Sequence, residues 1–162
     1  MAGMHARGLR AGGKNVLASV TGPDAAKAEQ FAKTYGVGRS GTDMVAGLRD
    51  ADAAIICSPS QFHYEQAAET LRAGVHALVE LPACSSTHQA AQLYDSAKSS
   101  RLQLECAHTG RYLAPYVFIG DWIRRGMLGE IQQLIYVRLI EPRSRSWTSE
   151  KFFRKRNGPS AR

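Results

Sequence analysis

Three polar clusters contain the residues of this chain whose types and spacing suit chemistry. They are Ser58-Pro59-Ser60 with His63, Glu80-Leu81-Pro82, and His108 with Arg111. Hydroxyl and imidazole groups can donate or accept hydrogen bonds, and a carboxylate can accept them from hydroxyl groups. Histidine also suits a general base near neutral pH, and arginine can bind a carboxylate through two parallel hydrogen bonds.

Each cluster directly follows a run of apolar residues that reads as a strand, at residues 53–57, 75–79 and 102–107. The first two runs are continuous, which is typical of parallel strands buried on both faces, and residues 62–73 between them have a helical pattern. A strand, a helix and a strand in this order make a parallel β-α-β unit. Because ligands of open parallel sheets bind at the carboxyl ends of the strands, these clusters are the first candidates for a site.

The rest of the chain continues this alternation. We predict helices at residues 2–11, 25–35, 42–48, 88–99 and 114–126, and strands at residues 15–21 and 131–140. Asp24 and Ser85-Ser86-Thr87 suit helix caps, and Gly36 suits a left-handed helix end. Residues 37–41 form either an edge strand or a loop. Alternating strands and helices predict an α/β fold with a doubly wound parallel sheet.

Length and composition are those of a globular domain. The chain has 162 residues, of which 44% are apolar and 22% charged, and this corresponds to about one domain. No apolar run approaches the roughly 20 residues that span a bilayer, and no apolar stretch of a secretory signal is visible. Cys57, Cys84 and Cys106 are widely spaced and odd in number, so we expect a reducing, cytoplasmic compartment and no disulfide. No closely spaced group of metal ligands occurs, so no metal is predicted.

The net charge of +7 is concentrated at one end of the chain. Residues 139–162 contain seven Lys or Arg and two Asp or Glu. The preceding 138 residues contain fourteen Lys or Arg and twelve Asp or Glu. A basic tail can bind nucleic acid or an anionic surface, but it is more commonly a solvated end. We therefore expect neither a membrane nor a nucleic acid as the partner.

Several short motifs, in this order and spacing, resemble the family of glucose–fructose oxidoreductase, inositol dehydrogenase and the rhizopine-catabolism oxidoreductases (Gfo/Idh/MocA). The motifs are Ala2-Gly3-Met4-His5, residues 25–32, Ser58-Pro59-Ser60-Gln61-Phe62-His63, Ala73-Gly74-Val75-His76, Glu80-Leu81-Pro82, residues 108–112 and residues 126–131. The resemblance covers about residues 1–140. Within the family the chain is most similar to the 4-carboxy-2-hydroxymuconate semialdehyde dehydrogenases, through residues 40–43, 80–82, 108–112, 130–133 and 145–148.

The resemblance implies an NAD(P)-dependent oxidoreductase that transfers a hydride from a hydroxyl or hemiacetal carbon, such as that of an aromatic ring-cleavage semialdehyde. It implies a Rossmann-like dinucleotide-binding domain over residues 1–113. Residues 114–162 then hold a connecting helix, the first strand of a truncated α+β substrate domain and the basic tail. It also implies a small-molecule substrate and a homo-oligomer.

Three departures from the family pattern give a second hypothesis. The family's first strand and Gly-rich turn, whose backbone holds a pyrophosphate, are absent before Ala2, and most of the second domain is absent. Leu81 stands where most of the family has a catalytic lysine, and leucine cannot transfer a proton. We expect a gap at the centre of the sheet. The alternative is therefore a catalytically inactive fragment that binds nucleotide weakly or only associates with a full-length relative.

The resemblance also implies a cofactor site made from strand ends and the start of the first helix. Its candidate residues are Ala2, His5, Thr21, Gly22, Ser58, Pro59, Ser60, His63, Glu80, Leu81 and Pro82, with His108 and Arg111 on the substrate side. His108 is a weak candidate for a catalytic base, and the catalytic residues are otherwise not identified. By residue type alone, some of these residues have other interpretations. Ser60 suits a helix cap, and Glu80 suits a solvated acid at a strand end. His5, His76 and His88 suit structural roles. Pro82 is a candidate for a cis peptide bond.

The end of the second family strand bears on the choice of cofactor. In NAD enzymes an acid at this point binds the ribose 2′-OH, but here the segment is Val20-Thr21-Gly22-Pro23 and the first acid is Asp24, at a later position. Without an acid there is no repulsion of a 2′-phosphate. NADP is therefore the first expectation and NAD the second.

Overall fold

The computed structural model of the protein describes residues 1–135 and 137. The chain divides into two compact units, Met1–Val117 and Phe118–Arg162. This division lies inside a helix, α6 (Ala114–Arg124), none of whose residues is buried. The predicted domain boundary after residue 113 stays a prediction, and the basic tail lies outside the described residues.

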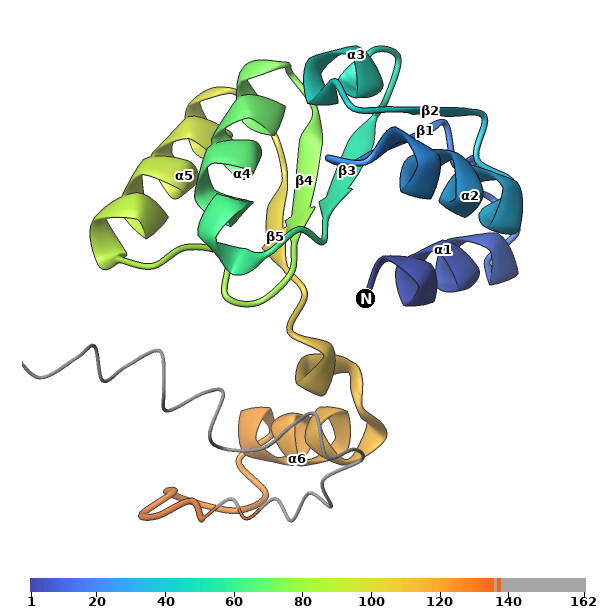
Figure 1. Cartoon of the computed structure of the whole chain (residues 1–162). Helices are drawn as coiled ribbons and strands as arrows, with labels where there is room; N and C mark the ends of the chain where they lie inside the picture. The colour runs from blue at the N-terminus through green and yellow to red at the C-terminus, as the bar shows by residue number, and fades with distance from the viewer. Residues whose placement is uncertain (136, 138–162) are drawn as a thin grey trace, which may run out of the picture. The chain divides into compact units, whose positions relative to one another are not determined.

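Helices and strands alternate along the first unit (Figure 1). The helices are α1 (Ala2–Ala11), α2 (Ala25–Tyr35), α3 (Met44–Leu48), α4 (His63–Arg72) and α5 (Thr87–Ser99), with short 3-10 helices η1 (Ser60–Phe62) and η2 (Thr109–Tyr112). The strands are β1 (Ser19–Thr21), β2 (Arg39–Gly41), β3 (Ala53–Ile56), β4 (His76–Val79) and β5 (Leu104–Cys106).

The strands form two parallel sheets. One pairs β1 with β2, and the other has the order β3-β4-β5. Among the described residues no pairing joins β1 to β3, so the sheet is interrupted where the resemblance places the family's first strand. The α/β fold with its parallel strands and this central gap is confirmed.

The helices pack on the two sheets and on one another. α4 packs on β3 and β4, α5 on β5, and α3 on both β1 and α4, while α2 packs on β1 and β2 and also contacts α1. The main core lies between β3-β4-β5 and the helices α4 and α5. Its buried members are Ile56, Ala67, Leu71, Ala77, Val79, Leu93 and Ala97.

Local signals account for several helix ends. The carboxylate of Asp24 accepts from the backbone N–H of Lys27 at the start of α2, and the hydroxyl of Ser86 accepts from that of Gln89 at the start of α5. Gly36 ends α2 with φ of 62°, in the left-handed conformation, which glycine adopts without strain. The predicted caps and this helix end are confirmed.

Some predicted strands are longer than the observed ones. Residues 15–18 precede β1 and are not part of a strand, although the carbonyl oxygens of Leu17 and Ala18 accept from the N–H groups of Gly38 and Arg39. β5 begins at Leu104 rather than at residue 102. Residues 131–135 of the strand predicted at 131–140 have no regular secondary structure, and residues 136 and 138–140 lie outside the described residues. Residues 37–41 include the edge strand β2. Apolar runs indicate burial, but a strand also needs a neighbour to pair with.

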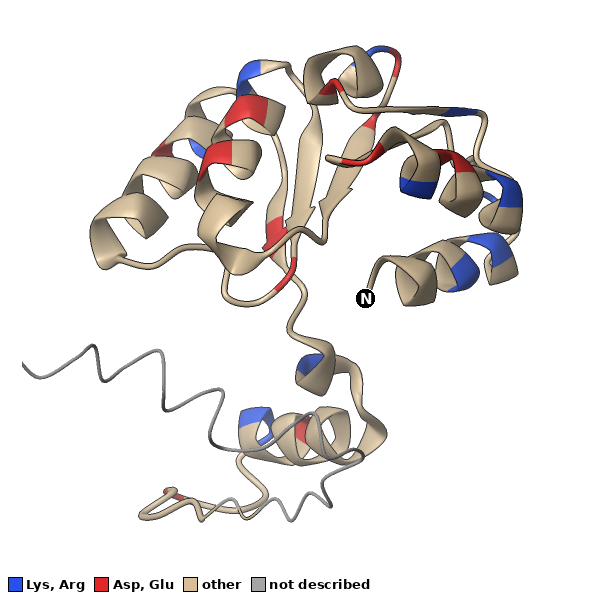
Figure 2. Ribbon diagram, in the orientation of Figure 1, with Lys and Arg blue, Asp and Glu red and all other residues tan. Residues whose placement is uncertain are grey.

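Both signs of charge occur along the helices of the described chain (Figure 2), as expected from the near balance of charges before residue 139. None of the described helices has the length and apolar character needed to cross a membrane.

Candidate functional site

The register of β3 and β4 brings two of the three polar clusters together. Ile56 is aligned with Val79, and the N–H of Glu80 donates to the carbonyl oxygen of Ile56 at 3.0 Å. Cys57 and Glu80 are therefore neighbours just beyond the paired residues. The turns that follow, Ser58-Pro59-Ser60 and Leu81-Pro82, leave the sheet at the same edge, as predicted for parallel strands.

The side chain of His63 connects these two turns. Its side chain is 2% exposed. Nδ1 lies 2.7 Å from the carbonyl oxygen of Pro82, and Nε2 lies 2.7 Å from that of Ser58. Carbonyl oxygens only accept, so both contacts are hydrogen bonds only when both ring nitrogens carry a hydrogen. The structure therefore places His63 as a bridge inside the protein, away from solvent.

The remaining residues of the two turns differ in how much they face solvent. The hydroxyl of Ser58 donates to Oε1 of Gln66 at 2.6 Å, whereas Pro59, Ser60, Leu81 and Pro82 are exposed. The peptide bond between Leu81 and Pro82 is cis, as the sequence suggested. No side-chain cap is found at the start of η1 or α4, so the alternative reading of Ser60 as a helix cap is wrong.

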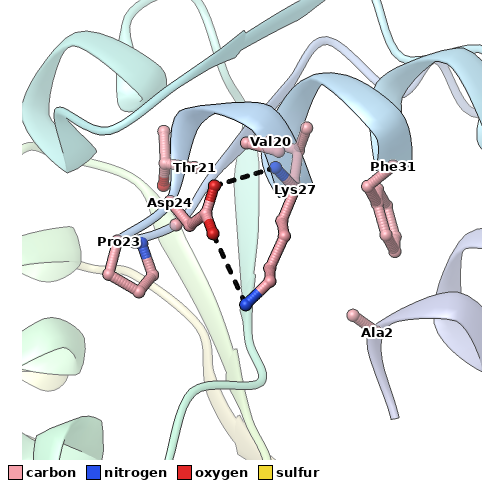
Figure 3. Close-up of a pocket in the computed structure, with 9 residues that line it drawn as sticks. Ala2, Val20, Thr21, Pro23, Asp24, Lys27 and Phe31 are labelled. Carbon is pink, nitrogen blue, oxygen red and sulfur yellow. Dashed lines mark hydrogen bonds and ion pairs between the residues drawn. The ribbon is translucent and has the colours of Figure 1, made fainter.

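A pocket lies at the carboxyl end of β1, between that strand and two helices (Figure 3). Its volume is about 250 Å³, and it is lined by Ala2, Val20, Thr21, Gly22, Pro23, Asp24, Lys27, Ala28 and Phe31. The pocket thus brings together three residues of the predicted cofactor site: Ala2, Thr21 and Gly22. No side chain caps the start of α1, and its first turn contains no acid, so this helix end suits a negatively charged group.

Asp24 and Lys27 supply the charges of this pocket (Figure 3). Oδ1 of Asp24 accepts from the backbone N–H of Lys27 at 3.1 Å, and Oδ2 lies 3.4 Å from Nζ of Lys27. The backbone hydrogen bond from Lys27, assisted by its ammonium group, lowers the pKa of Asp24 below the ordinary 3.8. Sequence reasoning missed Lys27, although its position in the first turn of the helix after the strand is the signal that could have found it.

A second group of polar side chains lies at the carboxyl ends of β3 and β4. Nε2 of His5, on α1, donates to Oε1 of Glu80 at 2.7 Å, and the side chains of the two residues are only 20% and 13% exposed. The thiol of Cys57 lies beside them. Burial, together with the charge of Glu80, raises the pKa of Cys57 above its ordinary 9.0, against a smaller opposing effect of the N-terminal ammonium.

The third cluster lies at the start of η2, which follows β5. His108 and Arg111 are both exposed, and neither lines the pocket at β1. Their assignment to the substrate side, and that of His108 as a catalytic base, stay predictions. Nearby, burial raises the pKa of Cys106, with smaller contributions from Cys84 and Glu105.

Comparison with protein families identifies one match over most of the chain. The sequence pattern of an oxidoreductase family with an NAD-binding Rossmann fold, GFO_IDH_MocA, matches residues 1–108. A 4-carboxy-2-hydroxymuconate-6-semialdehyde dehydrogenase from Sphingobium sp. (strain NBRC 103272 / SYK-6) is 34% identical over 120 residues. This similarity covers 73% of the chain but only 38% of the relative.

Solved structures show the same fold. An NAD-binding oxidoreductase from Klebsiella pneumoniae matches with a TM-score of 0.67 and 26% identity, covering 71% of this chain and 31% of that protein. A 3-ketoreductase variant from Actinomadura kijaniata, in complex with TDP-benzene and NADP, matches with a TM-score of 0.62 and 26% identity. This match covers 71% of this chain and 36% of that protein. The chain therefore spans well under half the length of these relatives.

Proposed function

The chain belongs to the GFO_IDH_MocA oxidoreductase family with its NAD-binding Rossmann fold, and from this premise we propose that it is the nucleotide-binding part of an NADP-dependent oxidoreductase. The observation that carries the proposal is the pocket at the end of β1, where Ala2 at the start of α1 meets Thr21 and Gly22. Dinucleotides bind at such strand ends, with a phosphate at a helix start.

The residues around the pocket fit this class of ligand. The pocket offers apolar contact from Val20, Ala28 and Phe31 for an adenine ring, and the hydroxyl of Thr21 for a sugar. The turns at Ser58 and Glu80, at the carboxyl ends of β3 and β4 in the other sheet, supply further hydroxyl and carboxylate groups. Together these residues support the predicted set of cofactor contacts.

Lys27 supports NADP as the finer choice of cofactor. Its side chain is 82% exposed, and the residue lines the pocket together with Gly22. A 2′-phosphate on the ribose would be attracted by this cation, and no acid stands at Gly22 to repel it. Asp24 is engaged with Lys27 through both carboxylate oxygens, so it is less available to a ribose 2′-OH, which is the contact that favours NAD.

For the reaction we propose oxidation of a hydroxyl or hemiacetal carbon. When bound, the nicotinamide supplies the hydride acceptor. The turns joined by His63 fix the positions of Ser58 and Glu80, which orient the ribose. Arg111, in η2 after β5, is the group that we propose binds a substrate carboxylate. The relative from Sphingobium, a semialdehyde dehydrogenase by name, supports a ring-cleavage semialdehyde as the substrate class.

A fluorescence titration of the folded chain with NADPH and NADH tests the cofactor proposal. We expect tighter binding of NADPH, and Lys27→Gln is expected to weaken NADPH binding by about tenfold, since one lost charge-assisted contact corresponds to roughly 1.5 kcal/mol. NADH binding should hardly change. Lys33→Gln is the matched control, because Lys33 lies on the same helix but pairs with Glu29 away from the pocket.

Two outcomes would overturn the proposal in different ways. Equal loss of NADPH and NADH binding in Lys27→Gln would remove the argument for NADP but keep a dinucleotide site. Failure of the folded wild-type chain to bind either nucleotide would favour the catalytically inactive fragment, for which Leu81 and the interrupted sheet are the supporting observations.

The cysteines and the family resemblance bear on location and assembly. All three cysteines are free, which supports a reducing, cytoplasmic compartment. A small-molecule substrate is consistent with an oxidoreductase, and a homo-oligomer stays a prediction from the family resemblance.

A further inference from the structure

Three side chains from three separate elements converge at the carboxyl ends of β3 and β4. His5 comes from α1, Cys57 follows β3 and Glu80 follows β4. One nitrogen, sulfur or oxygen atom of each lies within 4.8 Å of those of the other two. The aligned pair Ile56 and Val79 fixes Cys57 beside Glu80, and the hydrogen bond of 2.7 Å fixes His5 beside Glu80.

The chemistry of these three groups is that of a transition-metal ligand set. Imidazole nitrogen, thiolate sulfur and carboxylate oxygen are the three ligand types that Zn²⁺ takes in proteins, and three protein ligands leave a fourth position of the tetrahedron open. The thiolate disfavours Mg²⁺ and Ca²⁺, which prefer oxygen ligands. Two negative ligands, once the thiol loses its proton, balance the charge of a divalent ion.

The surroundings also suit a bound ion. The side chains of His5 and Glu80 are mostly buried, and Cys57 is half-buried, so these groups are held by packed elements and retain partial access to solvent. Two of the groups are at strand ends and the third is on a helix of ten residues, so regular elements position all three ligand atoms within 4.8 Å of one another.

We propose that His5, Cys57 and Glu80 bind a Zn²⁺ ion or a similar first-row divalent ion. The site does not depend on the proposed cofactor function, because the chemistry of its ligands is sufficient to define it. Glu80 would then have two roles. One carboxylate oxygen would bind the ion, and the other would remain for a ribose hydroxyl.

Cobalt spectroscopy tests the proposal on the full chain. The protein is freed of metal with a chelator, its fold is checked by circular dichroism, and Co²⁺ is added as a spectroscopic substitute for Zn²⁺. We expect a thiolate-to-cobalt charge-transfer band in the near ultraviolet and visible bands of a tetrahedral ion, saturating at one equivalent and displaced by Zn²⁺. A simple hydrogen bond between His5 and Glu80 would give no such bands.

Variants assign the band to these residues. Cys57→Ser is expected to abolish the charge-transfer band, and His5→Gln to weaken cobalt binding at least tenfold, since even loss of an outer-shell partner costs 10- to 100-fold. Cys106→Ser and His88→Gln are the matched controls and should leave the spectrum unchanged. No band in the folded wild-type chain, or a band that survives in Cys57→Ser and is lost in Cys106→Ser, would overturn the site.

Discussion

At the scale of single residues, His63 is the group that the candidate site depends on most. Each ring nitrogen lies 2.7 Å from a carbonyl oxygen, one in each of the two turns that end β3 and β4. The side chain is almost completely buried, so the bonds are protected from competition with water. The relative position of Ser58 and Pro82 therefore depends on one imidazole.

Replacing His63 by leucine should destabilise the protein. The variant fills a similar volume but removes the imidazole that donates to these carbonyl oxygens, and an unsatisfied buried polar group costs roughly 1–3 kcal/mol. We expect the free energy of unfolding, measured by urea denaturation, to fall by about 2 kcal/mol or more. His88→Leu, on the exposed side of α5, is the control and should change little. An unchanged unfolding midpoint in His63→Leu would show that the bridge contributes nothing.

Sequence reasoning identified some residues of the candidate site but did not predict which side chains lie close together. Ser58, His63 and Glu80 were found because each lies near the end of an apolar run. The group of His5, Cys57 and Glu80 was not found, and no metal was predicted, because His5 and Glu80 are separated by 75 positions. Spacing rules detect ligands that are close in sequence, whereas this group depends on the sheet register.

At the scale of the elements, helix ends follow from short-range chemistry. Asp24, Asp43 and Ser86 each accept hydrogen bonds from backbone N–H groups two or three positions later, and such contacts need no information from the rest of the chain. Strand lengths were predicted less well. Residues 15–18 are partly apolar but lie outside β1, because the extent of a strand depends on a neighbouring strand that local sequence does not specify.

The cap at Asp24 predicts a pH dependence for the stability of α2. Its pKa is lower in the folded protein than the ordinary 3.8, so the charged cap stabilises the fold above that pH, and this contribution is lost as the pH falls through the folded pKa. Asp24→Ala should therefore unfold at lower urea than the wild type at neutral pH, with the difference shrinking below pH 3.8. Asp24→Asn keeps an acceptor for the N–H of Lys27 and should retain most of the cap. A difference that stays constant with pH would contradict this account.

At the scale of the whole first unit, the two sheets have unequal cores. The sheet β3-β4-β5 and its helices bury a cluster that includes Ile56, Leu71, Val79 and Leu93. Around β1 and β2 the buried apolar residues are fewer: Ala6, Ala28 and Leu48. Apolar burial is the main stabilising term in folding, so the two parts should differ in stability.

Hydrogen exchange of backbone amides tests this difference. The amide of Ala77, bonded to the carbonyl oxygen of Gln103, and that of Glu80, bonded to Ile56, should exchange slowly. The amide of Arg39, bonded to Ala18, should exchange at least tenfold faster, because local opening of the weaker part requires less free energy. Equal protection of the two groups of amides would mean that the first unit opens as one cooperative body despite the interrupted sheet.

The interruption of the sheet also has a consequence for the solution behaviour of the protein. β1 and β3 each have one edge without a strand partner among the described residues, and neither contains a charged residue or a proline, the features that usually protect an edge from further pairing. Such edges can recruit extended segments of other molecules through their backbones. Self-association of this kind rises with concentration and is little affected by changes to surface charge elsewhere, whereas a lysine placed in β1 or β3 acts on it directly.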